Sequence, residues 1–251
     1  MESDGLNSLV INAGLSWRQI VILRTYARYL KQINAPFSLD YMEQALRNNP
    51  AITVKIVRLF ETYFDPASGT RRKANANRLK NEINRQLEEV ASADEDRILR
   101  RFLNGVEATL RTNFYQQAVD GGPKSYLSIK LDSNQIDDLP LPRPLREIFV
   151  YAPRFEAIHL RGGMVARGGL RWSDRPEDFR TEVLGLVKAQ MVKNAVIVPL
   201  GSKGGFVIKR PPASGGREAL LEEGIACYKM FMGGMLDITD NYKGNKVEVR
   251  K

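Results

Sequence analysis

The hydrophobic period of the chain changes at Gly121–Pro123, and this change restricts the possible folds more than any other feature of the sequence. Before it, apolar residues recur every three or four positions, which predicts amphipathic helices. After it, apolar and polar residues alternate over residues 127–131, which predicts a strand. We therefore expect an α+β or α/β fold, with a helical module over residues 1–122 and a mixed β-sheet domain with flanking helices over residues 123–251.

Helix start signals are clear in the first half. Ser16 with Gln19, and Ser92 with Glu95, have the spacing of a capping box, and Ser38 is a further N-cap candidate. We predict helices after Ser16 and Ser38, over residues 52–63, over residues 70–90, and after Ser92 with Leu99, Phe102, Val106 and Leu110 on one face.

The second half alternates extended and helical patterns. Acidic residues and Pro176 are favourable in a first helical turn, and they predict a helix over residues 176–194 with Leu184, Val187 and Met191 facing inward. We also predict strands over residues 148–151, 155–160 and 196–200, extended chain over 206–208, and a last helix from about residue 218 to 236.

Three short motifs place basic residues beside small ones: Arg167-Gly168-Gly169, Lys193-Asn194-Ala195 and Gly201-Ser202-Lys203-Gly204-Gly205. A substrate with two carboxylates requires fixed cations, and a lysine in a glycine turn can come close to a reacting carbon. Such a lysine, partly removed from water beside other cations, can exchange protons near neutral pH and polarise a carbonyl.

Each motif also has a simpler interpretation. Lys203 is solvated if the glycine turn is a surface hairpin, and Lys193 is a favourable cation at the C-terminus of any helix. A nucleotide P-loop requires Ser or Thr directly after its lysine, which Lys203 lacks, and the dinucleotide pattern G-x-G-x-x-G is absent. We therefore expect no nucleotide-binding domain in this chain.

Cysteine and histidine give little evidence of chemistry. Cys227 is the only cysteine, which excludes an intrachain disulfide and a cysteine-based metal cage, and we expect it in the core. His159 is the only histidine, lies in a predicted strand, and is expected to be structural. We expect no metal site.

The net charge of +9 permits a polyanionic partner but does not require one. Much of this charge falls on predicted helices without interleaved aromatic residues, so a solvated helix face is favoured over nucleic-acid binding. The apolar runs are too short for a membrane span and no signal segment is evident, so we expect a cytoplasmic protein without membrane contact.

The ordered set of motifs resembles the substrate domain of glutamate dehydrogenases, specifically the large multidomain NAD-specific type. The resemblance is carried by residues 166–175, 193–199 and 201–205. Residues 15–18, 27–30 and 36–41 also resemble the region that precedes the catalytic part of that family.

The resemblance implies that Lys203 is the catalytic lysine and that Lys193 binds the substrate α-carboxylate. Arg167 matches a position where the small hexameric enzymes usually carry a lysine for the distal carboxylate, and arginine can bind such a group bidentately. The implied role of the four glycines is close substrate approach: Gly168, Gly169, Gly204 and Gly205. The turn between Lys193 and Lys203 is shorter than in the small enzymes.

The resemblance further implies oxidation of L-glutamate to 2-oxoglutarate and ammonia with NAD, by a homo-oligomer. In the family, a catalytic aspartate and the NAD-binding domain follow the substrate lysines, so we expect this chain to be a fragment without dehydrogenase activity of its own. The alternative from another class is a helical interaction or regulatory module whose basic faces bind protein or nucleic acid.

Overall fold

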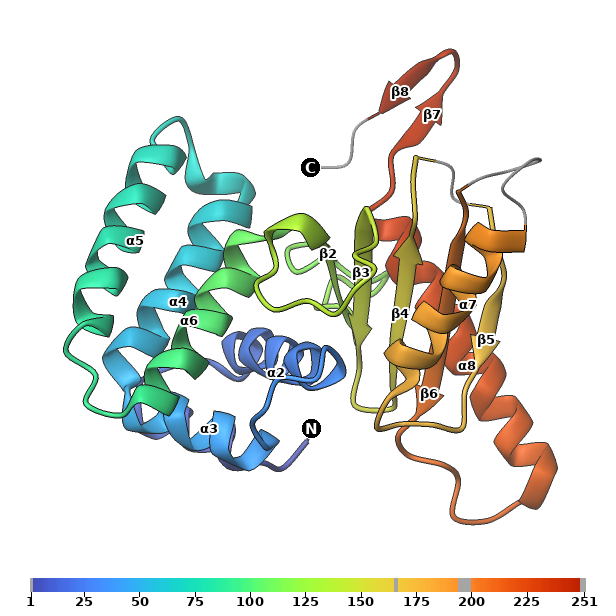
Figure 1. Ribbon diagram of the computed structural model, residues 1–251, viewed down its shortest axis with the longest axis horizontal. Helices are drawn as coiled ribbons and strands as arrows, with labels where there is room; N and C mark the ends of the chain where they lie inside the picture. The colour runs from blue at the N-terminus through green and yellow to red at the C-terminus, as the bar shows by residue number, and fades with distance from the viewer. Residues whose placement is uncertain (1, 165–166, 194–199, 249–251) are drawn as a thin grey trace. The chain divides into compact units, whose positions relative to one another are not determined.

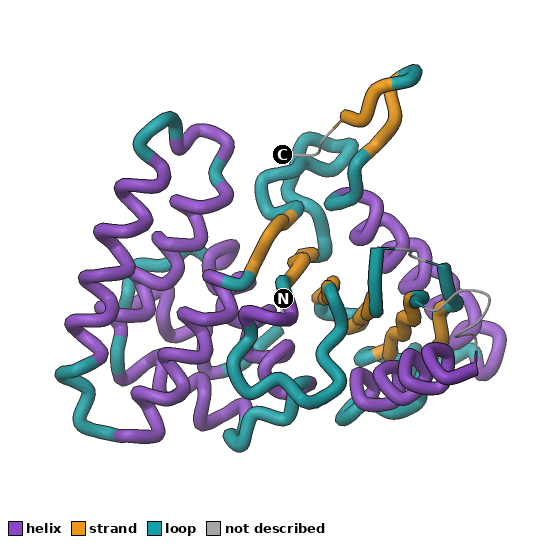
Figure 2. The backbone as a smooth tube through the Cα atoms, turned by 45° about the horizontal axis from the view of Figure 1, so that its top comes forward, coloured by secondary structure: helices purple, strands orange, loops and turns teal. Residues whose placement is uncertain are grey.

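The computed structural model describes residues 2–164, 167–193 and 200–248, and for residues 191–193 and 242 it describes the backbone only. The chain divides into two compact units, Met1–Ala108 and Thr109–Lys251. The colouring of Figure 2 separates a unit of helices and loops from a unit that mixes helices with strands. The division falls before the expected boundary at residue 122, because β1 (Thr109–Thr112) pairs with β2 (Leu127–Leu131).

The first unit is built from helices whose starts are set by local side chains. Ser16 and Gln19 form the predicted capping box, and the Ser38 and Ser92 hydroxyls accept bonds from the Tyr41 and Glu95 backbone N–H groups. The helices are α1 (Leu9–Asn12), α2 (Trp17–Gln32), α3 (Leu39–Asn48), α4 (Pro50–Phe64), α5 (Arg72–Leu87) and α6 (Ala93–Glu107). The expectation that Leu110 extends the last helix was wrong, because α6 ends at Glu107 and Leu110 lies in β1.

The second unit contains a six-stranded sheet in the order β1-β2-β3-β4-β6-β5 among its described residues. The remaining strands are β3 (Arg146–Tyr151), β4 (Phe155–Arg161), β5 (Leu170–Trp172) and β6 (Ser202–Ile208), followed by a hairpin of β7 (Asn241–Lys243) and β8 (Lys246–Glu248). Neighbours in the sheet are antiparallel except β5 and β6, which are parallel. The prediction of a mixed sheet with flanking helices is confirmed.

Helices α7 (Phe179–Lys193) and α8 (Gly216–Asp237) cover opposite faces of this sheet (Figure 1). A Cβ at Gly205 of β6 would lie 2.8 Å from Val183 of α7, whereas one at Gly234 of α8 would lie 3.0 Å from Val150 of β3. Helix α7 begins at Phe179 rather than at Pro176, and Arg175 and Asp178 pair with each other across the turn that precedes it.

Two predictions for the segment around α7 fall partly on residues that the structure does not describe in full. Leu184 and Val187 of α7 are buried, as predicted, whereas the side chain of Met191 is not described. The predicted strand over residues 196–200 lies outside the described residues except for Leu200, which belongs to no strand.

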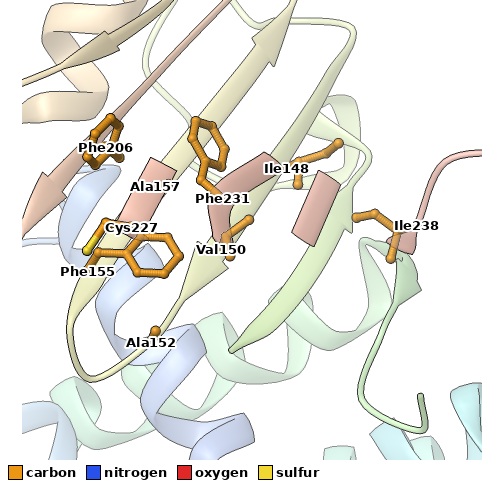
Figure 3. Packing of buried hydrophobic residues seen from close by; sticks show 9 residues of the cluster. All are labelled: Ile148, Val150, Ala152, Phe155, Ala157, Phe206, Cys227, Phe231 and Ile238. Carbon is orange, nitrogen blue, oxygen red and sulfur yellow. The ribbon is translucent and has the colours of Figure 1, made fainter. Parts of the chain in front are cut away.

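One hydrophobic cluster of the second unit lies between the sheet and α8 (Figure 3). Phe155 and Phe206 extend from the strands toward Cys227 and Phe231 of α8. Cys227 is fully buried, which confirms its predicted place in the core. Burial, followed by the Glu223 carboxylate, raises the pKa of the Cys227 thiol to about 12, so the thiol stays protonated near neutral pH.

Candidate functional site

Lys203 lies within strand β6, not in a glycine turn as the sequence suggested. It pairs with Leu160 of β4, and Gly204 pairs with both His159 of β4 and Leu170 of β5. A Cβ at Gly204 would lie 2.9 Å from the carbonyl oxygen of Ile158 and 2.5 Å from Leu170 Cδ2. The glycines therefore allow close packing inside the sheet, and the surface-hairpin interpretation is also wrong.

The structure brings the Arg167 motif alongside the Lys203 motif. The Ser202 N–H donates to the Arg167 carbonyl over 2.9 Å, and the Gly204 N–H donates to the Gly169 carbonyl over 3.2 Å. A Cβ on Gly168 would lie 1.4 Å from the Ser202 carbonyl oxygen, so only glycine fits there without a backbone shift. These contacts extend the parallel β5–β6 pairing back to residue 167.

Open space adjoins Lys203 on its β5 side. In the parallel pair, Gly169 and Lys203 come one residue before the paired Leu170 and Gly204. A Cβ at Gly169 would meet nothing within 4 Å, and the Lys203 side chain is partly buried. The position of Gly169, on the strand next to Lys203, therefore has open space where a side chain would be.

Helix α7 ends near the same end of β6. The Gln190 side-chain amide donates to the Arg167 carbonyl over 3.3 Å, and it lies 2.1 Å from where a Gly201 Cβ would be. Lys193 is the last residue of α7, but its side chain is outside the described atoms. Arg167 has an exposed side chain. Convergence of the three cationic side chains thus stays a prediction.

Two ion pairs that the sequence did not reveal fasten α7 to the sheet. Arg171 Nε of β5 lies 2.6 Å from Glu182 of α7, and the Ser173 hydroxyl donates to the same carboxylate over 2.5 Å. Arg180 of α7 pairs with Glu147 of β3 in the interior, where their side chains are 1% and 0% exposed. Glu147 directly precedes the apolar run of residues 148–151, and this position was the one available sequence signal for the second pair.

Acidic side chains interleave with the basic ones on the helical unit. Lys55 lies 3.8 Å from Glu82, Lys80 lies 2.5 Å from Glu107, and Arg100 contacts two carboxylates. Such mixed pairing is typical of a solvated surface, whereas a nucleic-acid surface presents cations without neighbouring acids. The basic helix faces therefore give no support to polyanion binding.

The described portion of the chain contains no group of three or more His, Cys, Asp or Glu residues arranged to hold a metal ion. In the same portion, no helix is both long and apolar enough to cross a membrane. The six-stranded sheet of the described residues has one parallel strand pair. A dinucleotide-binding domain, by comparison, has a mostly parallel sheet with a glycine-rich first turn.

The chain thus joins a helical unit to an α+β unit whose sheet carries the paired Arg167 and Lys203 motifs. A family model described as "Bacterial NAD-glutamate dehydrogenase, catalytic domain" matches residues 82–251, and one described as "Glutamate dehydrogenase, helical motif 3" matches residues 1–66. The chain belongs to the bacterial NAD-glutamate dehydrogenase family, which confirms the resemblance found in the sequence.

Three relatives named NAD-specific glutamate dehydrogenase support this assignment. The Halomonas elongata protein is 54% identical over 98% of the chain, the Pseudomonas aeruginosa protein 55% over 98%, and the Mycobacterium tuberculosis protein 52% over 96%. The chain spans 15% of the length of each of these relatives.

Proposed function

We propose that this chain is the segment of an NAD-dependent glutamate dehydrogenase that binds and activates the substrate. The complete enzyme would oxidise L-glutamate to 2-oxoglutarate and ammonia and reduce NAD. The observation that carries the proposal is the pair of backbone hydrogen bonds, at 2.9 and 3.2 Å, that join residues 167–169 to residues 202–204. They bring two motifs of the family together at one end of β6.

In this proposal Lys203 is the catalytic lysine, beside the open space over Gly169. Its ammonium polarises the substrate carbonyl and exchanges a proton during the reaction. Lys193, at the end of α7, binds the α-carboxylate, and Arg167 binds the distal carboxylate through its guanidinium fork. Four glycines lack side chains that would separate the β5 and β6 backbones or block the approach of substrate: Gly168, Gly169, Gly204 and Gly205.

The nicotinamide cofactor would be bound by a part of the enzyme other than this chain. The support is the mostly antiparallel sheet and the absence of a glycine-rich dinucleotide turn from the sequence. We further propose that the complete enzyme is a cytoplasmic homo-oligomer, which light scattering of the purified enzyme and cell fractionation would test.

The test is a Lys203→Ala substitution in a polypeptide that extends over the full length of the relatives. NADH formation from glutamate should fall by about a hundredfold or more, the usual contribution of a positioned acid–base group. Lys188→Ala is the matched control, because Lys188 has an exposed side chain on α7 and no assigned role. Turnover that survives in the Lys203 variant would remove the catalytic assignment.

A second measurement concerns the chain alone. The purified 251-residue chain should not reduce NAD in the presence of glutamate. It should still bind 2-oxoglutarate by calorimetry, and Lys203→Ala should weaken that binding. NAD reduction by this chain alone would contradict the proposed division of roles.

A further inference from the structure

A second set of basic side chains lies on the α8 face of the sheet. In the strand register, Lys130 of β2 is opposite Ile148 of β3, which is opposite His159 of β4. Arg146 and Arg161 form the next cross-strand pair of β3 and β4 on the same face. We call Lys130, Arg146, His159 and Arg161, together with Arg111 of β1, the cationic row.

The face on which the cationic row lies follows from the core packing. Phe155 and Ala157 of β4 pack against α8 (Figure 3). Side chains of a strand alternate between its faces, so His159 and Arg161, two and four residues after Ala157, lie on the same face. A Cβ at Gly204 would lie 3.3 Å from His159 Cδ2, whereas one at Gly205 would meet Val183 of α7. Lys203 shares its face with Gly205, so the row lies on the opposite face from Lys203.

Only two cations of the row have carboxylate partners among the described residues. Arg111 lies 2.7 Å from Asp240, and Arg146 lies 2.9 Å from Asp132. Arg161 donates through one terminal nitrogen to the Met164 carbonyl. Within the described part of the chain, Lys130 is partly buried and makes no hydrogen bond or ion pair. The row therefore carries more positive than negative charge.

Two nitrogens of the row are buried without a hydrogen-bond partner among the described atoms: His159 Nδ1 and Arg161 Nε. Polar groups in such positions cost free energy unless a ligand or water pairs with them. Burial, followed by the charges of Arg161 and Lys130, lowers the pKa of His159 to about 4. Burial and the charge of Arg111 also lower the pKa of Lys130. The Asp240 carboxylate offsets only part of this effect on Lys130.

We propose that the cationic row binds an oxyanion, the carboxylate or phosphate group of a small ligand, on the α8 face of the sheet. Lys130 and Arg161 supply the charge, and the orphan nitrogens Arg161 Nε and His159 Nδ1 supply hydrogen bonds. The bound anion offsets the mutual repulsion of the cations. This inference does not depend on the proposed dehydrogenase function.

The chain offers a direct probe of this site, because His159 is its only histidine. Its ring protons give a single set of NMR signals, which can be followed in a phosphate-free buffer while inorganic phosphate or glutarate is added. Saturable movement of the signals, with a rise of the His159 pKa, is the expected result. A response to phosphate alone or to glutarate alone supports the site and identifies the preferred group.

Three variants test whether the anion binds at the cationic row. Lys130→Gln should weaken the anion response about tenfold, as the loss of one charge-assisted hydrogen bond predicts. Lys229→Gln removes the same charge from the exposed side of α8 and should leave the response unchanged. Lys203→Ala should also leave it unchanged, because Lys203 lies on the other face.

The proposal is overturned if neither anion moves the His159 signals, or if Lys130→Gln and Lys229→Gln weaken the response equally. It is also overturned if Lys203→Ala abolishes the response, because the anion would then occupy the substrate site. Circular dichroism of each variant distinguishes a lost site from a lost fold. Should Lys130→Gln fail to fold, Arg161→Gln replaces it with the same expected result.

Discussion

The buried pair of Arg180 and Glu147 gives the sharpest test of how α7 is held over the sheet. Arg180 lies in the first turn of α7, and its Nε donates to Glu147 Oε2 of β3 over 3.0 Å. A second guanidinium nitrogen binds the other carboxylate oxygen, so the pair is bidentate. At 1% and 0% side-chain exposure, solvent does not screen the two charges.

Arg180→Met should therefore cost the second unit about 4 kcal/mol of its free energy of unfolding. Removing one partner of a buried ion pair typically costs ~3–5 kcal/mol, because the other charge stays in the interior. An independent value agrees, since two charges ~4 Å apart at an effective dielectric constant of ~20 attract by about 4 kcal/mol. Arg180→Met/Glu147→Gln should recover more than half of the loss, because no charge remains buried.

Urea unfolding of the second unit measures this cost. In a Trp17→Phe background, Trp172, which stacks on Phe206, is the remaining tryptophan and reports on the second unit alone. Arg175→Met is the matched control, because Arg175 pairs with Asp178 on the surface at the same end of α7 and should have no measurable effect. If Arg180→Met is as stable as this control, or if the double variant is no more stable than the single one, the reasoning is refuted.

Two further predictions concern the strands around Lys203. Gly168→Ala should destabilise the second unit by roughly 3 kcal/mol, because the added Cβ meets the Ser202 carbonyl, whereas Gly169→Ala should be tolerated; equal urea midpoints would contradict the close approach. His159→Gln should remove a pH dependence of stability. The His159 pKa is lowered from 6.5 to about 4, so the unfolded chain takes up the proton first. The free energy of unfolding is therefore about 3 kcal/mol higher above pH 6.5 than in acid, and this difference is lost as the pH falls to about 4. Parallel stability–pH curves for the variant and the parent would contradict it.

The helices of the first unit could be predicted because their signals are local. An N-cap hydroxyl bonds to a backbone group three residues away, so Ser16, Ser38 and Ser92 mark helix starts without knowledge of the rest of the fold. The strand β1 was missed for the opposite reason. Residues 109–112 continue the helical apolar spacing of α6, and only pairing with β2 makes them extended.

Local sequence was also insufficient to predict the structure of the glycine-rich motif around Lys203. A run of glycines is equally compatible with a turn and with a strand that neighbours approach closely, so the local sequence does not distinguish the two. The distinction comes from Ile158 and Leu170, which lie far away in the sequence and flank Gly204 on both sides. The local sequence therefore places a lysine among glycines but does not predict the strand in which that lysine lies.

The position of the Lys203 motif in strand β6 determines which of its side chains can act together. In a turn, successive side chains can point into one pocket, whereas in β6 they alternate between the two faces of the sheet. Lys203 then belongs to the α7 face, with Gly201 and Gly205, whose Cβ positions contact Gln190 and Val183 of α7. Ser202 and Gly204 belong to the α8 face, with His159. Strand β6 thus separates Lys203 on one face from the cationic row on the other, and a substitution on one face should leave the chemistry of the other intact.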